Sequence, residues 1–127
     1  NSILYGKTIN SFSSLSLFPP LILFSLDKKS SKLNIFNDSK QVSINILSEN
    51  QKFISNNFAK KNPNWSKIEY KILKNGNPII KNCVSNLDCK IIDKIKKGDH
   101  IIFICKVIHV LNNNKLKPLI YYNSKYY

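Results

Sequence analysis

The sequence predicts a mainly β chain, a closed antiparallel barrel with one or two short helices. Several segments alternate apolar and polar residues with the two-residue period of a strand, whereas a single segment has a strong helical period. Strands and helices do not alternate along the chain, which disfavours a doubly wound parallel sheet. At 127 residues the chain suits one domain with a single core, and we expect residues 1–127 to form it.

Six segments have the character of strands. In chain order they are Leu21–Leu26, Gln41–Leu47, Ile68–Leu73, Asn82–Asp93, His100–Leu111 and Pro118–Tyr122. The first follows Pro19-Pro20, which favours an extended entry. The second alternates strictly, and Asn75-Gly76 behind the third is a turn signal. These segments supply the strands of the expected barrel.

One helix is expected from Glu49 to Lys60. Its start is marked by Ser48–Gln51, which has the S-x-x-Q form of a capping box. Apolar residues then follow at helical spacing, and Asn62-Pro63 favours extended structure beyond the helix. A second, short helix is predicted over Ser31–Asn37 from a weaker pattern.

The basic charge does not by itself indicate a nucleic-acid partner. The formal net charge is +13, yet all 20 basic residues are Lys and none is Arg. Arg is the residue that best makes paired hydrogen bonds to bases and phosphates. The lysines are also scattered along the chain, so we expect a solvated basic surface and no nucleic-acid partner.

Three cysteines form no CxxC pair, and neither they nor the two histidines have metal-ligand spacing. We therefore expect no disulfide, no metal site and a reducing, cytoplasmic compartment. The longest apolar runs are too short to span a bilayer, and no signal peptide is visible, so no membrane partner is expected. Because the chain contains no Met, we expect it to begin inside a longer reading frame and to lack an N-terminal strand.

A hydroxyl-rich turn precedes the first predicted strand. The segment Thr8–Leu26 places Asn10 and four serines before Pro-Pro; these serines are Ser11, Ser13, Ser14 and Ser16. With only three glycines in the chain, a glycine-rich phosphate loop is unlikely, and hydroxyls offer a substitute. We therefore expect a flavin nucleotide here. The alternative is an ordinary loop, since Ser and Pro are common in loops.

The pattern T-x-N-S-F-x-S-L-S-L-x-P-P-L over Thr8–Leu21 resembles the flavin reductase-like family of FMN-binding split barrels, the small components of two-component flavin-dependent monooxygenases. The resemblance continues, in the family's order, through Ser43–Gln51, Asn57–Ala59, Gly98–His100, Lys117–Tyr122 and Tyr126. It covers nearly the whole chain and implies an antiparallel Greek-key split barrel that works as a homodimer. The family's upstream strand would lie before Asn1.

The resemblance also implies the residues of the site. Those implied for the flavin are Lys7, Thr8, Asn10, Ser11, Ser13, Ser14, Lys28, Lys29 and Ser30. His100 and Tyr126 are implied for the nicotinamide nucleotide. From the residues alone, His100 could be a solvated strand end and Tyr126 a frayed terminus. No catalytic acid, base or nucleophile is expected, because the flavin carries the chemistry.

The implied activity is NAD(P)H:flavin oxidoreductase, in which NAD(P)H passes a hydride to the flavin and reduced flavin serves a separate monooxygenase. FMN and FAD both remain open as the flavin. The absence of Arg removes the usual clamp for the 2′-phosphate and favours NADH over NADPH. Two alternatives stand beside this function: a non-catalytic FMN-binding split-barrel protein, and a basic nucleic-acid-binding barrel.

Overall fold

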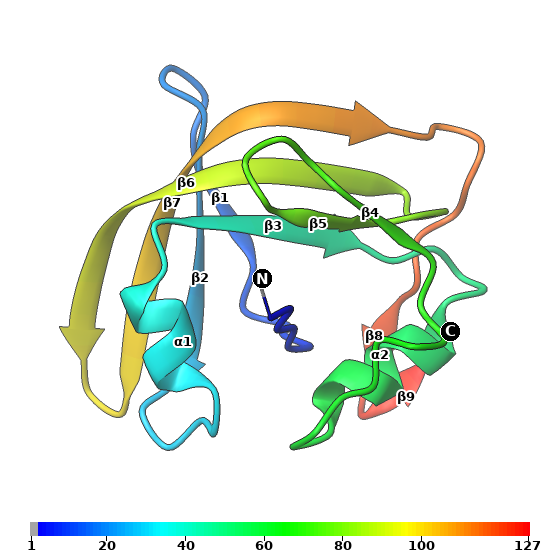
Figure 1. The fold of residues 1–127 in the computed structure, drawn as a ribbon, viewed down its shortest axis with the longest axis horizontal. Helices are drawn as coiled ribbons and strands as arrows, with labels where there is room; N and C mark the ends of the chain where they lie inside the picture. The colour runs from blue at the N-terminus through cyan, green and yellow to red at the C-terminus, as the bar shows by residue number, and fades with distance from the viewer. Residues whose placement is uncertain (1–2) are drawn as a thin grey trace. The chain divides into compact units, whose positions relative to one another are not determined.

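The computed structural model describes residues 3–127, which are mainly β with antiparallel sheets and two helices (Figure 1). The elements are β1 (Ser13–Ser16), β2 (Leu21–Asp27), α1 (Leu33–Asp38), β3 (Gln41–Ile46), α2 (Lys52–Ala59), β4 (Tyr70–Ile72), β5 (Pro78–Ile80), β6 (Ser85–Lys97), β7 (His100–Asn112), β8 (Tyr121–Tyr122) and β9 (Lys125–Tyr126). Five strands form one sheet in the order β1-β2-β7-β6-β3, while β4–β5 and β8–β9 are separate pairs. The predicted mainly β chain with short helices is confirmed.

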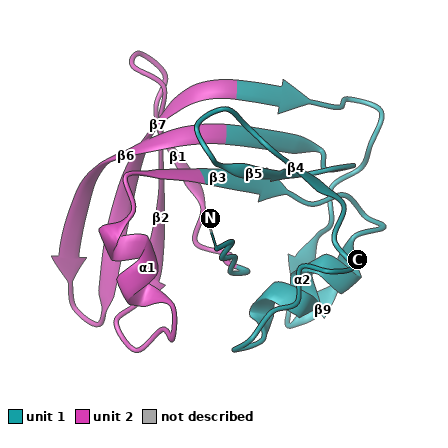
Figure 2. Ribbon diagram, in the orientation of Figure 1, with its two compact units in different colours: residues 1–8, 43–87, 110–127 teal, residues 9–42, 88–109 magenta. Residues whose placement is uncertain are grey.

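The chain divides into two compact units, coloured separately in Figure 2. Unit 1 comprises Asn1–Thr8, Ser43–Leu87 and Val110–Tyr127, and unit 2 comprises Ile9–Val42 and Asp88–His109. Strands β3, β6 and β7 contribute residues to both units. Each unit is described by itself below.

The core of unit 2 is built by β2 and β7. These strands pair antiparallel, with Phe24 directly opposite Phe103. Their rings stack with centroids 5.0 Å apart and an angle of 9° between the ring planes. Side chains at every second position of both strands are buried: Ile22, Phe24, Leu26, Ile101, Phe103 and Cys105. The period-two pattern of the sequence therefore places one continuous apolar face on this strand pair.

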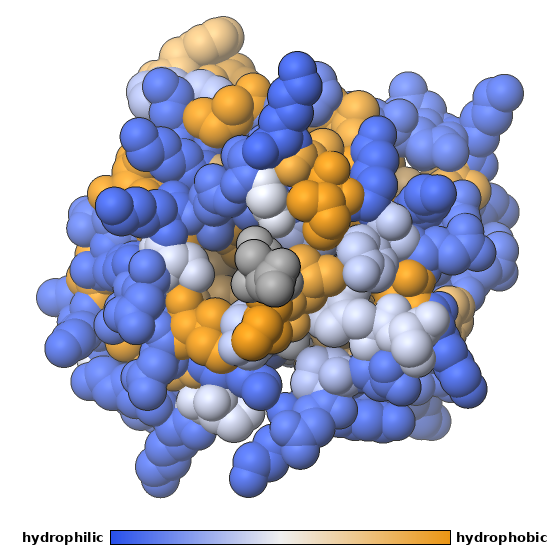
Figure 3. Space-filling model, viewed as in Figure 1, coloured by the Kyte–Doolittle hydropathy of each residue, from blue (hydrophilic) through white to orange (hydrophobic). Residues whose placement is uncertain are grey.

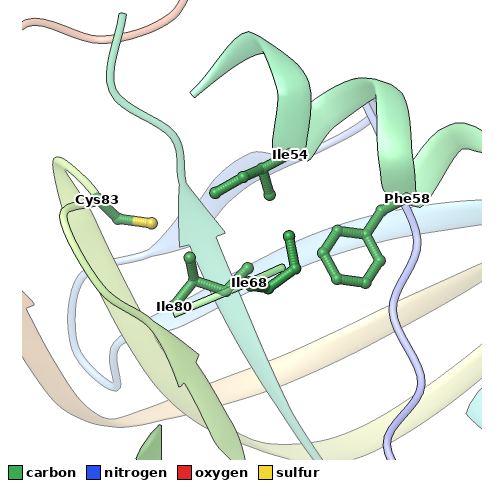
Figure 4. Packing of buried hydrophobic residues seen from close by; sticks show 5 residues of the cluster. All are labelled: Ile54, Phe58, Ile68, Ile80 and Cys83. Atoms are coloured by element: carbon green, nitrogen blue, oxygen red, sulfur yellow. The ribbon is translucent and has the colours of Figure 1, made fainter. Parts of the chain in front are cut away.

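The core of unit 1 lies under α2. The helix contributes Ile54 and Phe58, which pack with residues just before β4, at the end of β5 and just after β5 (Figure 4). These partners are Ile68, Ile80 and Cys83. The Phe58 ring meets Trp65 edge-on with centroids 4.8 Å apart. Trp65 and Phe58 thus pack against each other inside unit 1.

The predicted helix over Glu49–Lys60 begins later than expected, at Lys52. The N–H of Glu49 donates to the carbonyl of Lys117 at 2.8 Å, so the chain there stays paired with another segment. Half of the predicted capping box is present, since the Gln51 side chain accepts from the N–H of Ser48 at 3.0 Å. The box therefore closes a turn that precedes the helix.

Three short elements differ from the sequence prediction. Ser13–Ser16, expected within a turn, forms β1 on the edge of the large sheet. Pro78–Ile80 forms the unpredicted β5, and the predicted strand over Pro118–Tyr122 is largely replaced by the β8–β9 pair. Serine has a low strand propensity, and strands of two or three residues are too short to show a period. Their pairing partners, rather than their own residues, make them strands.

Candidate functional site

In unit 2, the end of β2 meets the start of β7. Asp27 lies opposite His100 in the register of the two strands. Directly beyond it, the N–H of Lys28 donates to the carbonyl of Asp99 at 2.9 Å. The predicted phosphate loop, Lys28–Ser30, and the predicted nicotinamide residue, His100, therefore lie at neighbouring strand ends.

The turn between β6 and β7 orients His100. Gly98 has a φ of +57°, a conformation that other residues adopt only with strain, which explains a glycine there. Asp99 follows, and its carboxylate lies 2.7 Å from His100 Nδ1. This hydrogen bond, with the charge of His100, lowers the pKa of Asp99. An ionised Asp99 thus holds an imidazole whose side chain is still 44% exposed.

The loop Lys28–Ser30 has the groups that a phosphate needs. Asp27 braces the loop, because its carboxylate accepts from the N–H of Lys29 at 2.8 Å and its carbonyl from the N–H of Ser30 at 2.9 Å. Ser30 Oγ is buried, yet it has no hydrogen-bond partner among residues 3–127. A buried hydroxyl without a partner is costly, and a ligand oxygen would satisfy it. With two exposed lysines beside it, the loop fits a flavin phosphate.

The serines of the predicted flavin turn divide into two kinds. Ser11 Oγ donates to the carbonyl of Ser25 at 2.9 Å and accepts from the N–H of Ser25 at 3.0 Å. Its hydroxyl is therefore used to hold the segment before β1 against β2. Asn10, Ser13 and Ser14 are exposed, and the Ser13 hydroxyl bonds only its neighbour's carbonyl. These three side chains remain open to a ligand.

In unit 1, Ser55 joins two of the predicted site residues. Thr8 makes two hydrogen bonds to α2. Its N–H donates to the carbonyl of Phe58 at 3.1 Å, and its hydroxyl donates to the carbonyl of Ser55 at 2.5 Å. On the same residue, Ser55 Oγ lies 2.7 Å from the hydroxyl of Tyr126. Ser55 is only 4% exposed. Sequence reasoning missed Ser55, because one small polar residue within a helix carries no signal of its own.

Tyr126 belongs to an ordered hairpin. It lies in β9 opposite Tyr121, and the two rings have centroids 5.0 Å apart. The ammonium group of Lys52 lies 5.7 Å from the Tyr126 ring centroid, within the range of a cation–π contact. These contacts fix Tyr126 on α2, in place of the frayed terminus considered above. Lys7, the remaining predicted residue of unit 1, is exposed.

The cysteines are packing residues. All three are free and buried. Burial raises the pKa of Cys83 to about 11 and that of Cys89 and Cys105 to about 12, so the thiols stay protonated at neutral pH. Within residues 3–127, no group of three or more His, Cys, Asp or Glu side chains is placed to hold a metal ion. Among the same residues, every helix is too short or too polar to cross a membrane.

These features define an antiparallel β protein with exposed lysines and a histidine at the strand ends of unit 2, and with hydroxyl groups hydrogen-bonded on α2 in unit 1. The chain belongs to the family of the flavin reductase like domain, whose model matches residues 3–127. The match covers almost the whole chain and confirms the family that the sequence resembles.

Named relatives agree with the family. The chain is 35% identical over 123 residues to a probable flavin reductase of Rhizobium meliloti, covering 96% of this chain and 39% of the relative. It is 41% identical over 108 residues to the reductase component of a flavin-dependent trigonelline monooxygenase from Acinetobacter baylyi, covering 80% and 33%. The chain thus spans between about a third and two fifths of the length of these two relatives. A solved Streptomyces globisporus NADH:FAD oxidoreductase, in complex with NAD and FAD fragments, matches with a TM-score of 0.92 at 25% identity, covering 97% and 76%.

Proposed function

We propose that this chain is an NAD(P)H:flavin oxidoreductase that supplies reduced flavin to a partner monooxygenase. The observation that carries the proposal is the meeting of the Lys28–Ser30 loop with His100, in a chain that belongs to the flavin reductase like family. The reductase component of a monooxygenase among its relatives supports the partner. A non-catalytic flavin carrier would not need His100 held beside the phosphate loop.

We infer separate roles for the groups of the two units. In unit 2, Lys28, Lys29 and Ser30 would bind the flavin phosphate, and His100 would contact the nicotinamide nucleotide. The other flavin contacts proposed are Lys7, Asn10, Ser13 and Ser14 through their side chains, and Thr8 and Ser11 through their backbone, because the hydroxyls of these two bond to other residues of the protein. Tyr126 is proposed on the nicotinamide side. The flavin, FMN or FAD, supplies the ring that accepts a hydride. The protein would contribute proximity and orientation of the two nucleotides, without a side-chain acid or base.

We further infer one split-barrel domain that works as a homodimer in the cytoplasm. The large antiparallel sheet and the solved flavin reductases support the barrel.

Exposed apolar side chains support the homodimer. Apolar groups interrupt the hydrophilic surface (Figure 3), and at the β1–β2 turn Leu17 and Phe18 are 75% and 89% exposed. Such groups suit a protein interface. Three free cysteines suit a reducing compartment. Sedimentation equilibrium tests the dimer, and a mass of 14.7 kDa would contradict it.

A steady-state assay tests the proposed activity. Purified protein should oxidise NADH when FMN or FAD is present, and it should use NADPH less well because the chain has no Arg to bind the 2′-phosphate. A flavin carrier would bind FMN and leave NADH unchanged. A nucleic-acid binder would instead retain DNA or RNA with an affinity that falls steeply with salt. Folded protein that oxidises neither nicotinamide with either flavin would overturn the reductase assignment.

The Ser55–Tyr126 hydrogen bond should position the nicotinamide side of the reaction. Ser55→Ala and Tyr126→Phe should each lower kcat/KM for NADH by about tenfold, the effect of losing one buried hydrogen bond. Because both changes remove the same bond, the double variant should be no worse than either single variant. Tyr122→Phe, an exposed change in the same hairpin, is the control. Losses that multiply in the double variant would show that the bond is not the cause.

A further inference from the structure

Unit 1 contains a cavity of about 390 Å³ at the amino end of α2. Its walls come from the turn before α2, from the segments that flank the β4–β5 pair and from Leu116. None of the residues proposed for the flavin or the nicotinamide nucleotide lines it. The volume is in the range of cavities that hold small molecules, about 300–1,000 Å³. The cavity is therefore a candidate for a second, separate ligand.

The charges around the cavity favour an anion. Lys67 and Lys81 line it together with one carboxylate, Glu69. The N–H of Lys81 donates to the carbonyl of Glu69 at 2.9 Å, which joins these two walls through the backbone. Among residues 3–127, none of the three side chains forms an ion pair. Two cations against one anion leave an excess positive charge at the cavity wall.

The helix end adds donors on another wall. Helix α2 has eight residues, and the first N–H groups of a helix have no partner within it. Its N-cap residue, Gln51, is buried but makes no side-chain hydrogen bond to the helix. Instead, the Gln51 amide accepts from the N–H of Ser48 at 3.0 Å and donates to the carbonyl of Lys81 at 2.7 Å. Gln51 thus braces the cavity and leaves the positive end of α2 open to a ligand.

Ser48 provides an independent donor to a ligand. It lines the cavity and is only 4% exposed. Every hydrogen bond that the structure records for Ser48 runs through its backbone: its N–H donates to the Gln51 side chain, and its carbonyl accepts from the N–H of Gln51. Among residues 3–127 its hydroxyl makes no hydrogen bond to the protein, and it is not one of the fully buried polar atoms, so a molecule in the cavity can reach it. A hydroxyl at a cavity wall can donate to a ligand oxygen.

We propose that this cavity binds a small phosphate-bearing molecule. The phosphate would accept from the Ser48 hydroxyl and from the free N–H groups at the start of α2, with Lys81 as a charge-assisted donor. Lys67 adds positive charge at the rim, and Glu69 disfavours ligands that carry further negative charge. The site does not depend on the proposed reductase activity, because it shares no residue with that proposal.

Inorganic phosphate is the probe for this site. In a titration of ¹⁵N-labelled protein at constant ionic strength, saturable shifts should appear at the amides of Ser48, Lys52, Phe53 and Asn82. Lys81→Gln should weaken this binding by about tenfold, and Ser48→Ala by about fivefold, because each removes a donor to the phosphate. Lys74→Gln, which removes an exposed lysine outside the cavity, should leave the affinity unchanged.

The same experiment can overturn the proposal. Shifts confined to Lys28–Ser30, or spread without saturation over the lysines of the surface, would show that the cavity binds no phosphate. An equal effect of Lys81→Gln and Lys74→Gln would mean that only net charge matters. If Lys81→Gln does not fold, Ser48→Ala alone decides, since a loss of one hydroxyl leaves the charge unchanged. Flavin-dependent NADH oxidation should be retained by Ser48→Ala, which separates this site from the proposed reductase function.

Discussion

Replacing Phe103 with Ala is expected to lower the free energy of unfolding by about 4 kcal/mol. Phe103 is fully buried, and its ring stacks on Phe24 across the β2–β7 strand pair. The substitution removes a large apolar side chain and leaves a cavity beside two paired strands. The strands cannot shift to fill this cavity without breaking the hydrogen bonds between them. Equilibrium unfolding in urea, with equal slopes for both proteins, measures the loss.

Two further variants separate the cavity from the loss of an aromatic ring. Phe103→Leu keeps most of the volume and should cost about 1.5 kcal/mol or less. Phe53→Ala removes the same ring from a half-exposed position on α2, where Phe53 is 56% exposed, and should cost at most about 1 kcal/mol. If Phe103→Ala proved no more destabilising than Phe53→Ala, the β2–β7 core described here would be wrong.

The long strands could be predicted because their burial follows their own residues. In β2 and in the first half of β7, apolar side chains at every second position are the ones that the fold buries. No such signal marks β1, β5 or the β8–β9 pair, which are short and take their conformation from partners distant in sequence. The start of α2 shows the same effect, since the backbone pairing of Glu49 with Lys117 delays the helix.

The residue types of the site could be predicted, whereas their partners could not. The resemblance named Lys28–Ser30 and His100 separately, and only the register of β2 and β7 shows that they meet. In the sequence, Ser11 does not differ from the other serines of the predicted flavin turn. In the structure, its side chain is hydrogen-bonded to the backbone of Ser25. Ser55 has no signal at all in the sequence. Tertiary hydrogen bonds decide which hydroxyls are open to a ligand.

The excess of lysine is weak evidence for a nucleic-acid partner, because a lysine can also serve the fold. The run Lys94–Lys97 contributes to the net charge that raised a nucleic-acid alternative. In the structure, however, the ammonium group of Lys94 donates to the carbonyls of Asn37 and Ser39, the latter at 3.1 Å. These carbonyls lie at the end of α1, where a cation is favourable. At least one lysine of the run therefore serves the fold.

His100→Ala is expected to lower kcat/KM for NADH by about 100-fold, the size of effect seen when a reacting group is misplaced by about 1 Å. His100 is the one predicted nicotinamide residue of unit 2, and its ring is held by Asp99 while remaining partly exposed. FMN affinity should change little, because the phosphate loop keeps its own hydrogen bonds to Asp27. Steady-state oxidation of NADH and quenching of FMN fluorescence measure the two quantities.

His109→Ala is the matched control, because His109 is an exposed residue on the same strand and should not affect kcat/KM. Asp99→Asn should lower kcat/KM by about tenfold, since the ring would lose an ionised partner. The pKa of Asp99 is lowered, so its carboxylate is ionised at neutral pH, and the contact is lost only as the pH falls through that lowered pKa. Hence the effect of Asp99→Asn should be full at neutral pH and should shrink in acid. Two results would show that the Asp99–His100 pair does not orient the nicotinamide. One is an effect of Asp99→Asn on kcat/KM that does not depend on pH. The other is a loss of kcat/KM in His109→Ala equal to that in His100→Ala.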